Sequence, residues 1–130
     1  MVQIDLSDKV AIVTGGSRGI GRAISIALAQ AGANVNIIYA SKEDAALETR
    51  GEIAQLGGNA EIYKCNVADE KMVEETLKKV IDKFGKIDIL VNNAGINRDT
   101  LLLRMSVDDW ESVMETNLKG AFLMTKYSIK

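Results

Sequence analysis

The sequence predicts an α/β fold, in which helices cover both faces of a parallel sheet. Three observations support this prediction. Short β-rich apolar runs alternate with longer amphipathic stretches along the 130 residues. The run at residues 87–91 is almost uninterrupted in its apolar character, which is typical of a strand buried on both faces. The alternation contains no internal repeat, low-complexity tract or linker, so a single domain is expected.

The first strand is predicted at residues 10–14, an apolar run followed directly by glycines. A helix is predicted at residues 20–31, and Gly32 is expected to end it. The second strand is predicted at residues 35–39. The first helix is expected to face the sheet with Ile20, Ile24, Ala27, Leu28 and Ala31.

Polar and glycine residues mark the ends of the next elements. Ser41 is expected to cap a second helix that runs to about residue 56, where Gly57 and Gly58 end it. The third strand is predicted at residues 60–67.

Asp69 is expected to cap a third helix, from about residue 70 to residue 84, and Gly85 is expected to end it. The fourth strand is predicted at residues 87–91. Ser106 is expected to cap a helix that begins at Val107, and a further helix is expected to follow Asn117 and run to the end of the chain.

This strict alternation predicts right-handed crossovers and a doubly wound sheet with the strand order 3-2-1-4. Ligands of such sheets bind at the carboxyl ends of the strands, beside the switch point between strands 1 and 4. Two segments fall at this point, residues 14–21 and residues 92–95. We therefore expect a ligand site between them.

Residues 14–21 read Thr-Gly-Gly-Ser-Arg-Gly-Ile-Gly and join a predicted strand to a predicted helix. Gly15 allows a sharp turn, Gly19 allows the backbone to approach a pyrophosphate closely, and Gly21 allows the helix to pack against the sheet. The start of the helix offers N–H donors and a positive dipole end to phosphates. The pattern predicts dinucleotide binding, and the alternative is a plain strand-to-helix turn.

Residues 92–95 read Asn-Asn-Ala-Gly after the fourth strand. A turn of small residues lets a flat ring lie against the backbone, and asparagine side chains lock such a turn through bonds to backbone groups. The alternative is an asparagine-rich turn without a ligand.

The spacing Thr-Gly-x-x-x-Gly-x-Gly, together with Asn-Asn-Ala-Gly, resembles the short-chain dehydrogenase/reductase family. Within it, residues 97–105, Trp110 and residues 115–120 are similar to the 3-oxoacyl-acyl-carrier-protein reductases. The resemblance covers all 130 residues and the first half of such an enzyme. It implies a Rossmann-type N-terminal half and NADPH-dependent reduction of 3-oxoacyl thioesters in fatty acid biosynthesis. The implied cofactor-binding residues are Gly15, Gly16, Ser17, Arg18, Gly19, Ile20, Gly21, Ala40, Asn66, Val67, Asn93, Ala94 and Gly95.

The end of the second strand favours NADP(H) as the cofactor. Folds that bind NAD place an acid there for the ribose hydroxyl, whereas residues 38–42 read Ile-Tyr-Ala-Ser-Lys. Arg18 in the glycine turn can reach a 2′-phosphate. The alternatives are that Arg18 is a solvated turn residue and that Ser41 and Lys42 only begin a helix.

Asn66 and Val67 close the third predicted strand, and the resemblance places them beside the adenine. An amide both donates to and accepts from a base edge, although an ordinary strand-end asparagine is the alternative. The neighbouring Cys65 is expected to be a small buried residue without a redox role.

The resemblance implies that Asn117 is a catalytic asparagine, which holds a helix kink and a water behind a catalytic lysine. The alternative is an asparagine that only interrupts a helix. The family's reductases also need a serine and a Tyr-x-x-x-Lys pair, because a phenol requires a nearby cation to act near neutral pH. Tyr39 and Tyr63 lack a lysine four residues on, and the spacing from Tyr127 to Lys130 is one residue short.

We therefore expect residues 1–130 to be an NADP-binding domain that stops before the Ser, Tyr and Lys region. Little or no turnover is expected from this chain alone, and the alternative function is an inactive nucleotide-binding half-domain or an assembly fragment. The partners expected are an acyl thioester for the parent enzyme and a second copy or the missing C-terminal half. The open edge at residues 87–91 and the last two helices are the expected contact regions.

Composition excludes several other classes. The net charge of -2 and the lack of a basic run argue against nucleic acid as a partner. The absence of histidine excludes a histidine-based triad or zinc site, and no metal is expected. No apolar stretch reaches the length of a membrane span, and the N-terminus does not resemble a signal peptide. A single cysteine fits a cytoplasmic location.

Overall fold

Four parallel strands form one sheet in the computed structural model, which describes residues 4–94 and 104–129. The strands are β1 (Val10–Thr14), β2 (Asn34–Tyr39), β3 (Asn59–Lys64) and β4 (Ile89–Val91). Their order across the sheet is β3-β2-β1-β4, with parallel pairing throughout. The predicted order 3-2-1-4 is therefore confirmed.

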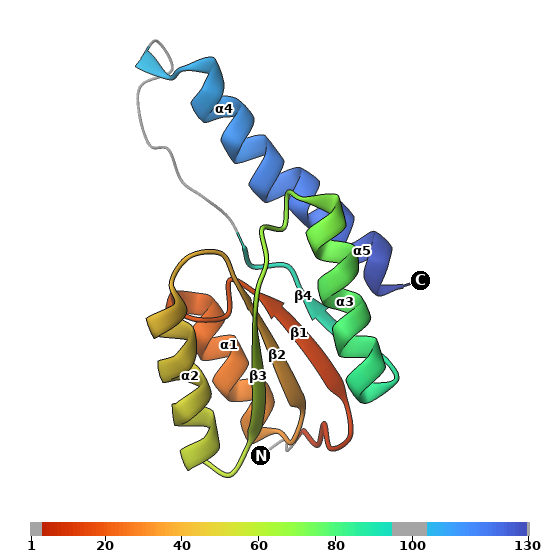
Figure 1. The fold of residues 1–130 in the computed structure, drawn as a ribbon. Helices are drawn as coiled ribbons and strands as arrows, with labels where there is room; N and C mark the ends of the chain where they lie inside the picture. Colours follow the sequence, from red (N-terminus) through yellow and green to blue (C-terminus); the bar gives the residue numbers. More distant parts are fainter. Residues whose placement is uncertain (1–3, 95–103, 130) are drawn as a thin grey trace.

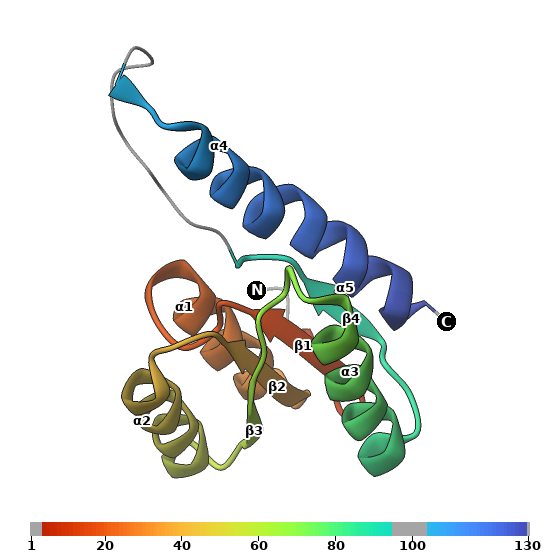
Figure 2. The ribbon, with the colours of Figure 1, turned by 45° about the horizontal axis from the view of Figure 1, so that its top comes forward.

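Helices cover both faces of this sheet (Figure 1). The α-helices of the described residues are α1 (Gly19–Gln30), α2 (Glu43–Gln55), α3 (Glu70–Phe84), α4 (Val107–Met114) and α5 (Gly120–Ser128). α1 and α2 pack on one face, and α3 and α5 pack on the other (Figure 2). No helix within residues 4–94 and 104–129 has the length and apolar character that crossing a lipid bilayer demands.

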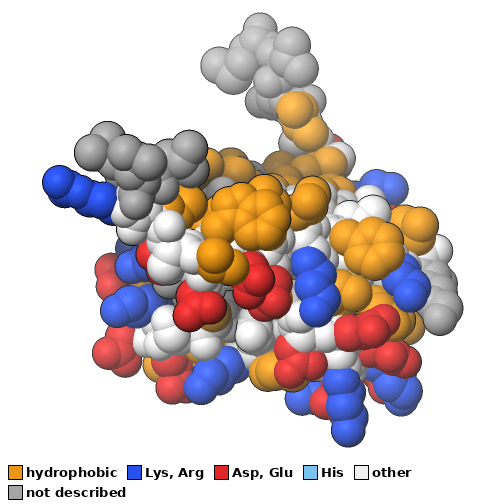
Figure 3. Space-filling model, turned by 90° about the horizontal axis from the view of Figure 1, so that it is seen from above, with side chains coloured by type: hydrophobic (Ala, Val, Ile, Leu, Met, Phe, Trp, Pro, Cys, Tyr) orange, Lys and Arg blue, Asp and Glu red, His pale blue; other side chains and the backbone are white. Residues whose placement is uncertain are grey.

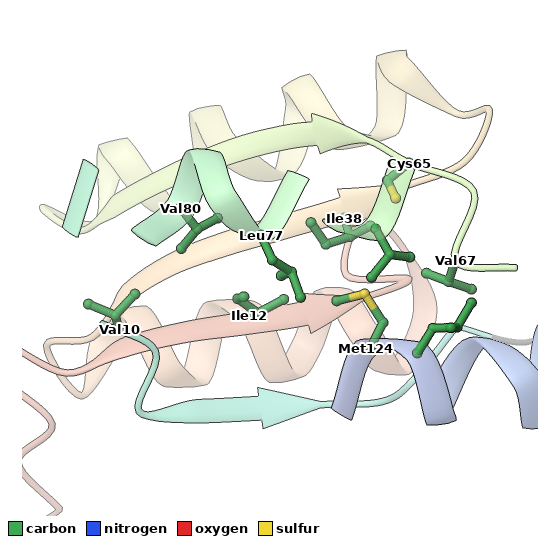
Figure 4. Close-up of a cluster of buried hydrophobic side chains, with 10 residues drawn as sticks. Val10, Ile12, Ile38, Cys65, Val67, Leu77, Val80 and Met124 are labelled. Carbon is green, nitrogen blue, oxygen red and sulfur yellow. The ribbon is translucent and has the colours of Figure 1, made fainter. Parts of the chain in front are cut away.

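Alternating side chains along β1 and β2 build a separate core on each face of the sheet. Ile12 and Ile38 point toward α3 and α5, where they pack in one cluster with Leu77 and Met124 (Figure 4). The core on the opposite face consists of Ala11, Val13, Ala29, Ala33, Val35, Ile37 and Ile53. The two central strands are thus buried on both faces.

The face of α1 that meets the sheet differs from the expected one. Its buried residues are Gly21, Ser25 and Ala29, whereas Ile20 is 75% exposed and Ala27 is also exposed. The tight glycine turn brings the start of the helix so close to the sheet that only small side chains fit there. Larger apolar side chains pack at the margins of this contact: Ile24, Ile26 and Leu28.

Two of the three predicted helix caps are confirmed. Asp69 and Ser106 each accept a hydrogen bond from the backbone N–H three residues later, over 3.2 and 3.0 Å. Ser41 does not cap α2, because Lys42 occupies the N-cap position and no side chain caps this helix. The acidic residues in the first turn of α2 favour the helix through its dipole instead.

The third and fourth strands are shorter than predicted. Asn66 and Val67 follow β3 rather than close it. β4 begins two residues later than predicted, because Asp88 bonds to Val10 through its side chain as well as its backbone. Asp88 Oδ2 accepts a hydrogen bond from the Val10 N–H over 2.8 Å, and the Asp88 N–H donates to the Val10 carbonyl. The carboxylate thereby fixes the start of β1.

α4 and α5 form one continuous helical rod rather than two separate helices (Figure 1). A π-helical segment, η2 (Glu115–Lys119), joins them and contains Asn117. Asn117 therefore marks an irregular turn within a helix, not the break before a new one. α5 packs against α3, whereas α4 extends away from the sheet and has no buried residue.

Candidate functional site

A cavity of about 460 Å³ lies at the carboxyl ends of β1, β2 and β3, beside the switch point. This volume falls within the range of about 300–1,000 Å³ that is common for small-molecule sites. Its lining residues are Gly15, Ser17, Arg18, Gly19, Ile38, Tyr39, Ala40, Ser41, Lys42, Cys65, Asn66, Val67, Asn93, Ala94 and Thr116. The location agrees with the position predicted for ligands of a doubly wound sheet.

The glycine turn shapes one wall of this cavity. Gly15 has a φ of +64°, a left-handed conformation that favours glycine. A Cβ at Gly21 would overlap the Gly15 carbonyl and the Asn93 side chain, so the helix can approach the turn this closely only with glycine there. α1 begins at Gly19 without a side-chain cap, which leaves the N–H donors of its first turn for another acceptor.

Thr14 joins the two predicted motifs into one unit. Its hydroxyl, in a residue that is 1% exposed, accepts hydrogen bonds from the Asn93 and Ala94 N–H groups, each over 2.9 Å. The same hydroxyl donates to the Val91 carbonyl over 3.3 Å. Asn93 Nδ2 donates to the Gly15 carbonyl over 3.1 Å, which closes the connection from the other side.

Nine of the thirteen cofactor residues expected from the sequence line the cavity. Gly16 and Gly21 are buried beneath the turn and shape it from within, and Ile20 lies at the surface outside the lining. Gly95 lies outside the described residues. The sequence did not single out Thr14 or Thr116 for the site, although a threonine at the end of a buried strand, next to a glycine turn, was a signal for Thr14.

The end of the cavity beyond β2 is electropositive. Among the described residues that line the cavity, only Arg18 and Lys42 are charged. The exposed Arg18 side chain has no hydrogen-bond or ion-pair partner within residues 4–94 and 104–129. This arrangement suits an anionic group.

The segment that follows β3, the neighbour of β2 in the sheet, forms another part of the cavity wall. Asn66 Oδ1 accepts a hydrogen bond from the Ala68 N–H over 3.0 Å, which makes a short asparagine turn. Val67 and Cys65 are buried beside it, and burial raises the pKa of the Cys65 thiol. The thiol is therefore a packing group rather than a reactive thiolate.

Asn117 borders a second, much smaller cavity of about 20 Å³. Thr14, Asn92 and Thr116 also line it, so it is polar and large enough for about one water molecule. Tyr127 lies farther along the same helical rod, and its hydroxyl donates to Glu70 Oε2 over 2.7 Å. This bond raises the pKa of Tyr127 to about 12, which makes it a poor acid-base group near neutral pH.

No three carboxylate, thiol or imidazole side chains gather as potential metal ligands in the part of the chain that the structure describes.

Residues 9–130 match the family model for short chain dehydrogenase. The 3-oxoacyl-[acyl-carrier-protein] reductase of Synechocystis sp. is 50% identical over 121 residues, which are 93% of this chain and 49% of that protein. The 3-oxoacyl-[acyl-carrier-protein] reductase FabG of Staphylococcus epidermidis is 47% identical over 115 residues, or 88% of this chain and 47% of that protein. The chain thus spans about half the length of the curated relatives it matches.

Solved structures of related proteins share the fold of this chain. A short chain dehydrogenase from Burkholderia cenocepacia in complex with NADP has a TM-score of 0.90 and 37% identity, over 95% of this chain and 51% of that one. A dehydrogenase/reductase from Sinorhizobium meliloti has a TM-score of 0.94 and 36% identity, over 98% of this chain and 50% of that one.

Proposed function

Because the chain belongs to the short chain dehydrogenase family, we propose that it forms the NADP(H)-binding half of a reductase that acts on 3-oxoacyl thioesters. The observation that carries this proposal is the cavity at the switch point, where Thr14 joins the glycine turn to the Asn-Asn-Ala turn. The names of relatives at 47% and 50% identity support the substrate class. The related structure in complex with NADP supports the cofactor.

The described side of the cavity fits NADP(H). The first turn of α1 offers N–H donors for the pyrophosphate, and a Cβ on Gly19 would meet no atom within 4 Å, so the backbone there is open to a ligand. Arg18 and Lys42 suit a 2′-phosphate, whereas the described residues that line the cavity include no acid that would bind a free ribose hydroxyl. We assign Asn66 and Val67 to the adenine, and the Asn93-Ala94-Gly95 turn to the nicotinamide end.

NADPH, when bound, supplies a hydride for the reduction of a carbonyl group. The residues of this chain bind and orient the dinucleotide, and we assign Asn117 a supporting role beside the small polar cavity. We assign the proton donor to none of the three tyrosines: Tyr39 and Tyr63 have no lysine four residues on, and the Tyr127 hydroxyl is bound to Glu70. The second candidate, a nucleotide-binding half-domain without turnover, is favoured by this same observation.

Titration of the purified chain with NADPH and NADH tests the cofactor assignment. We expect NADPH to bind more tightly than NADH. Arg18→Ala should reduce this preference about tenfold, since a charge-assisted hydrogen bond contributes about 1.5–3 kcal/mol. An unchanged preference in Arg18→Ala would refute the assigned phosphate contact. Consumption of NADPH with an acetoacetyl thioester distinguishes the two functions, and we expect little or none from residues 1–130 alone.

We further propose that the chain pairs with a second copy through the helical rod of α4, η2 and α5. Apolar side chains at helical spacing are exposed along it, and hydrophobic groups gather on this upper face of the molecule (Figure 3). These residues are Val107, Trp110, Met114, Leu118 and Phe122. The first half of the rod is acidic at Asp108 and Asp109 and the second half is basic at Lys119 and Lys126, which favours an antiparallel arrangement.

Sedimentation of the chain and of Leu118→Lys tests this pairing. We expect a dimer that the charged substitution dissociates. A dimer that persists in the variant would favour the outer edge of β4, the other contact region predicted from the sequence. A cytoplasmic location remains our proposal, on the ground of the single buried cysteine.

A further inference from the structure

Thr49 is a polar side chain buried in the middle of α2. It is 0% exposed, and its hydroxyl donates to two backbone carbonyls. The Ser17 oxygen lies 2.7 Å and the Ala45 oxygen 2.9 Å from Thr49 Oγ1. The Ala45 contact is local to the helix. The Ser17 contact is the shorter one, and it crosses 32 positions to reach the glycine turn.

Two halves of the glycine turn are held in different ways. The first half is fixed by the bond from the Gly15 N–H to the Ile38 carbonyl, over 2.9 Å, and by the Asn93 side chain. Within the described residues, the Ser17 carbonyl is held by Thr49. This carbonyl belongs to the peptide group that leads into Arg18, so Thr49 fixes the direction in which the backbone enters that residue.

α2 also follows directly on residues 40–42, the other part of the electropositive end of the cavity. Residues 40–42 line the cavity, and the helix begins at the next residue, so Thr49 connects the segment carrying Lys42 to the segment carrying Arg18. Two ion pairs, from Arg22 to Glu48 and Glu52, hold α1 and α2 together without touching the turn. α1 and α2 are therefore also held together by contacts that do not involve Thr49.

We propose that Thr49 is a positioning residue that places Arg18 opposite Lys42, and thereby sets the preference for NADP(H) over NAD(H). This inference rests on the proposed cofactor. It differs from the assignment of Arg18 itself, because the Thr49 hydroxyl bonds to the backbone carbonyl directly before Arg18 and not to the Arg18 side chain. A buried threonine that merely filled space would be replaceable by valine, which has nearly the same shape, without any change in selectivity.

Dissociation constants for NADPH and NADH, measured by titration of the full chain, test the proposal. We expect Thr49→Val to weaken NADPH binding about fivefold, as for the loss of one hydrogen bond, and to change NADH binding by less than about twofold. Thr49→Ser keeps the hydroxyl and should restore the preference. Glu52→Gln is the matched control on the same helix, and its NADPH-to-NADH ratio should equal that of the wild type.

A double-mutant cycle shows whether Thr49 acts through Arg18. In an Arg18→Ala background, Thr49→Val should have no further effect on NADPH binding. Equally weaker binding of both dinucleotides, or an unchanged ratio of their dissociation constants in folded Thr49→Val, would overturn the inference. Circular dichroism establishes that the variant is folded. Thr49→Ala replaces Thr49→Val if the valine variant does not fold. A wild-type chain that binds neither dinucleotide would instead overturn the proposed cofactor, and this inference with it.

Discussion

Replacing Thr14 with valine removes the hydroxyl that joins the two turns of the site while it leaves the shape of the side chain nearly unchanged. The hydroxyl accepts from two backbone N–H groups, those of Asn93 and Ala94, each over 2.9 Å. Valine offers no acceptor, so both donors lose their partner in a partly buried setting. An unpaired buried donor costs about 1–3 kcal/mol, and we expect Thr14→Val to destabilise the chain by about 2–4 kcal/mol.

Urea denaturation followed by circular dichroism measures this loss. The free energy of unfolding of a domain is about 5–15 kcal/mol, so the expected change shifts the midpoint clearly, with an unchanged slope. Thr14→Ser keeps the hydroxyl and should recover most of the stability. Thr125→Val is the matched control, because its exposed hydroxyl accepts one bond from Asn92 and its loss should cost less than about 0.5 kcal/mol.

A Thr14→Val variant whose unfolding free energy lies within about 0.5 kcal/mol of the wild-type value would refute the reasoning, because two partly buried N–H groups without an acceptor should cost more than this. A large loss in Thr14→Ser as well would show that the methyl packing matters, not the hydroxyl. NADPH titration of the same variants tests whether the cavity opens when the connection is lost.

Three further predictions concern other parts of the fold. Gly21→Ala should destabilise the chain by about 1–3 kcal/mol and weaken NADPH binding in titrations, because the added methyl group overlaps the Gly15 carbonyl. Asn36→Val should raise the unfolding free energy by about 1 kcal/mol in urea, because the gain from removing the buried Oδ1, which has no partner among the described residues, should exceed the loss of the bond from Nδ2 to the Ala11 carbonyl; a lower value would contradict this account. The bond from Val10 lowers the pKa of Asp88 below 3.8, so the stability that its carboxylate contributes is present above that pH and is lost as the pH falls through the folded value. The difference between wild type and Asp88→Asn in urea should therefore shrink from pH 6 to pH 3.

Local patterns were sufficient to predict the sheet and its order, because each strand and helix carries its own apolar periodicity. Asp69 and Ser106 cap their helices as predicted, since a cap depends on only three following residues. The prediction of which face of α1 meets the sheet was wrong, because the turn before the helix decides how close the helix lies to the sheet. A local pattern does not contain that distance.

The parts of the site that the sequence did not indicate are long-range contacts. Thr14 bonds residues 79 and 80 positions away, and Thr49 bonds one 32 positions away. A threonine within a strand or helix has no local feature that distinguishes these roles from ordinary packing. The glycine and asparagine motifs were recognisable because their residue types report backbone requirements at their own positions.

The central position of β1 has a consequence for the order in which the protein is completed during synthesis. β1 pairs with β2 from nearby sequence, whereas β4 joins its other side only after a much longer stretch of chain has left the ribosome. Until then the Thr14 hydroxyl has neither of the N–H groups that it later accepts from. The two sides of the cavity are therefore made at different times, and of the pairings among these four strands, the one that adds β4 completes the connection between them.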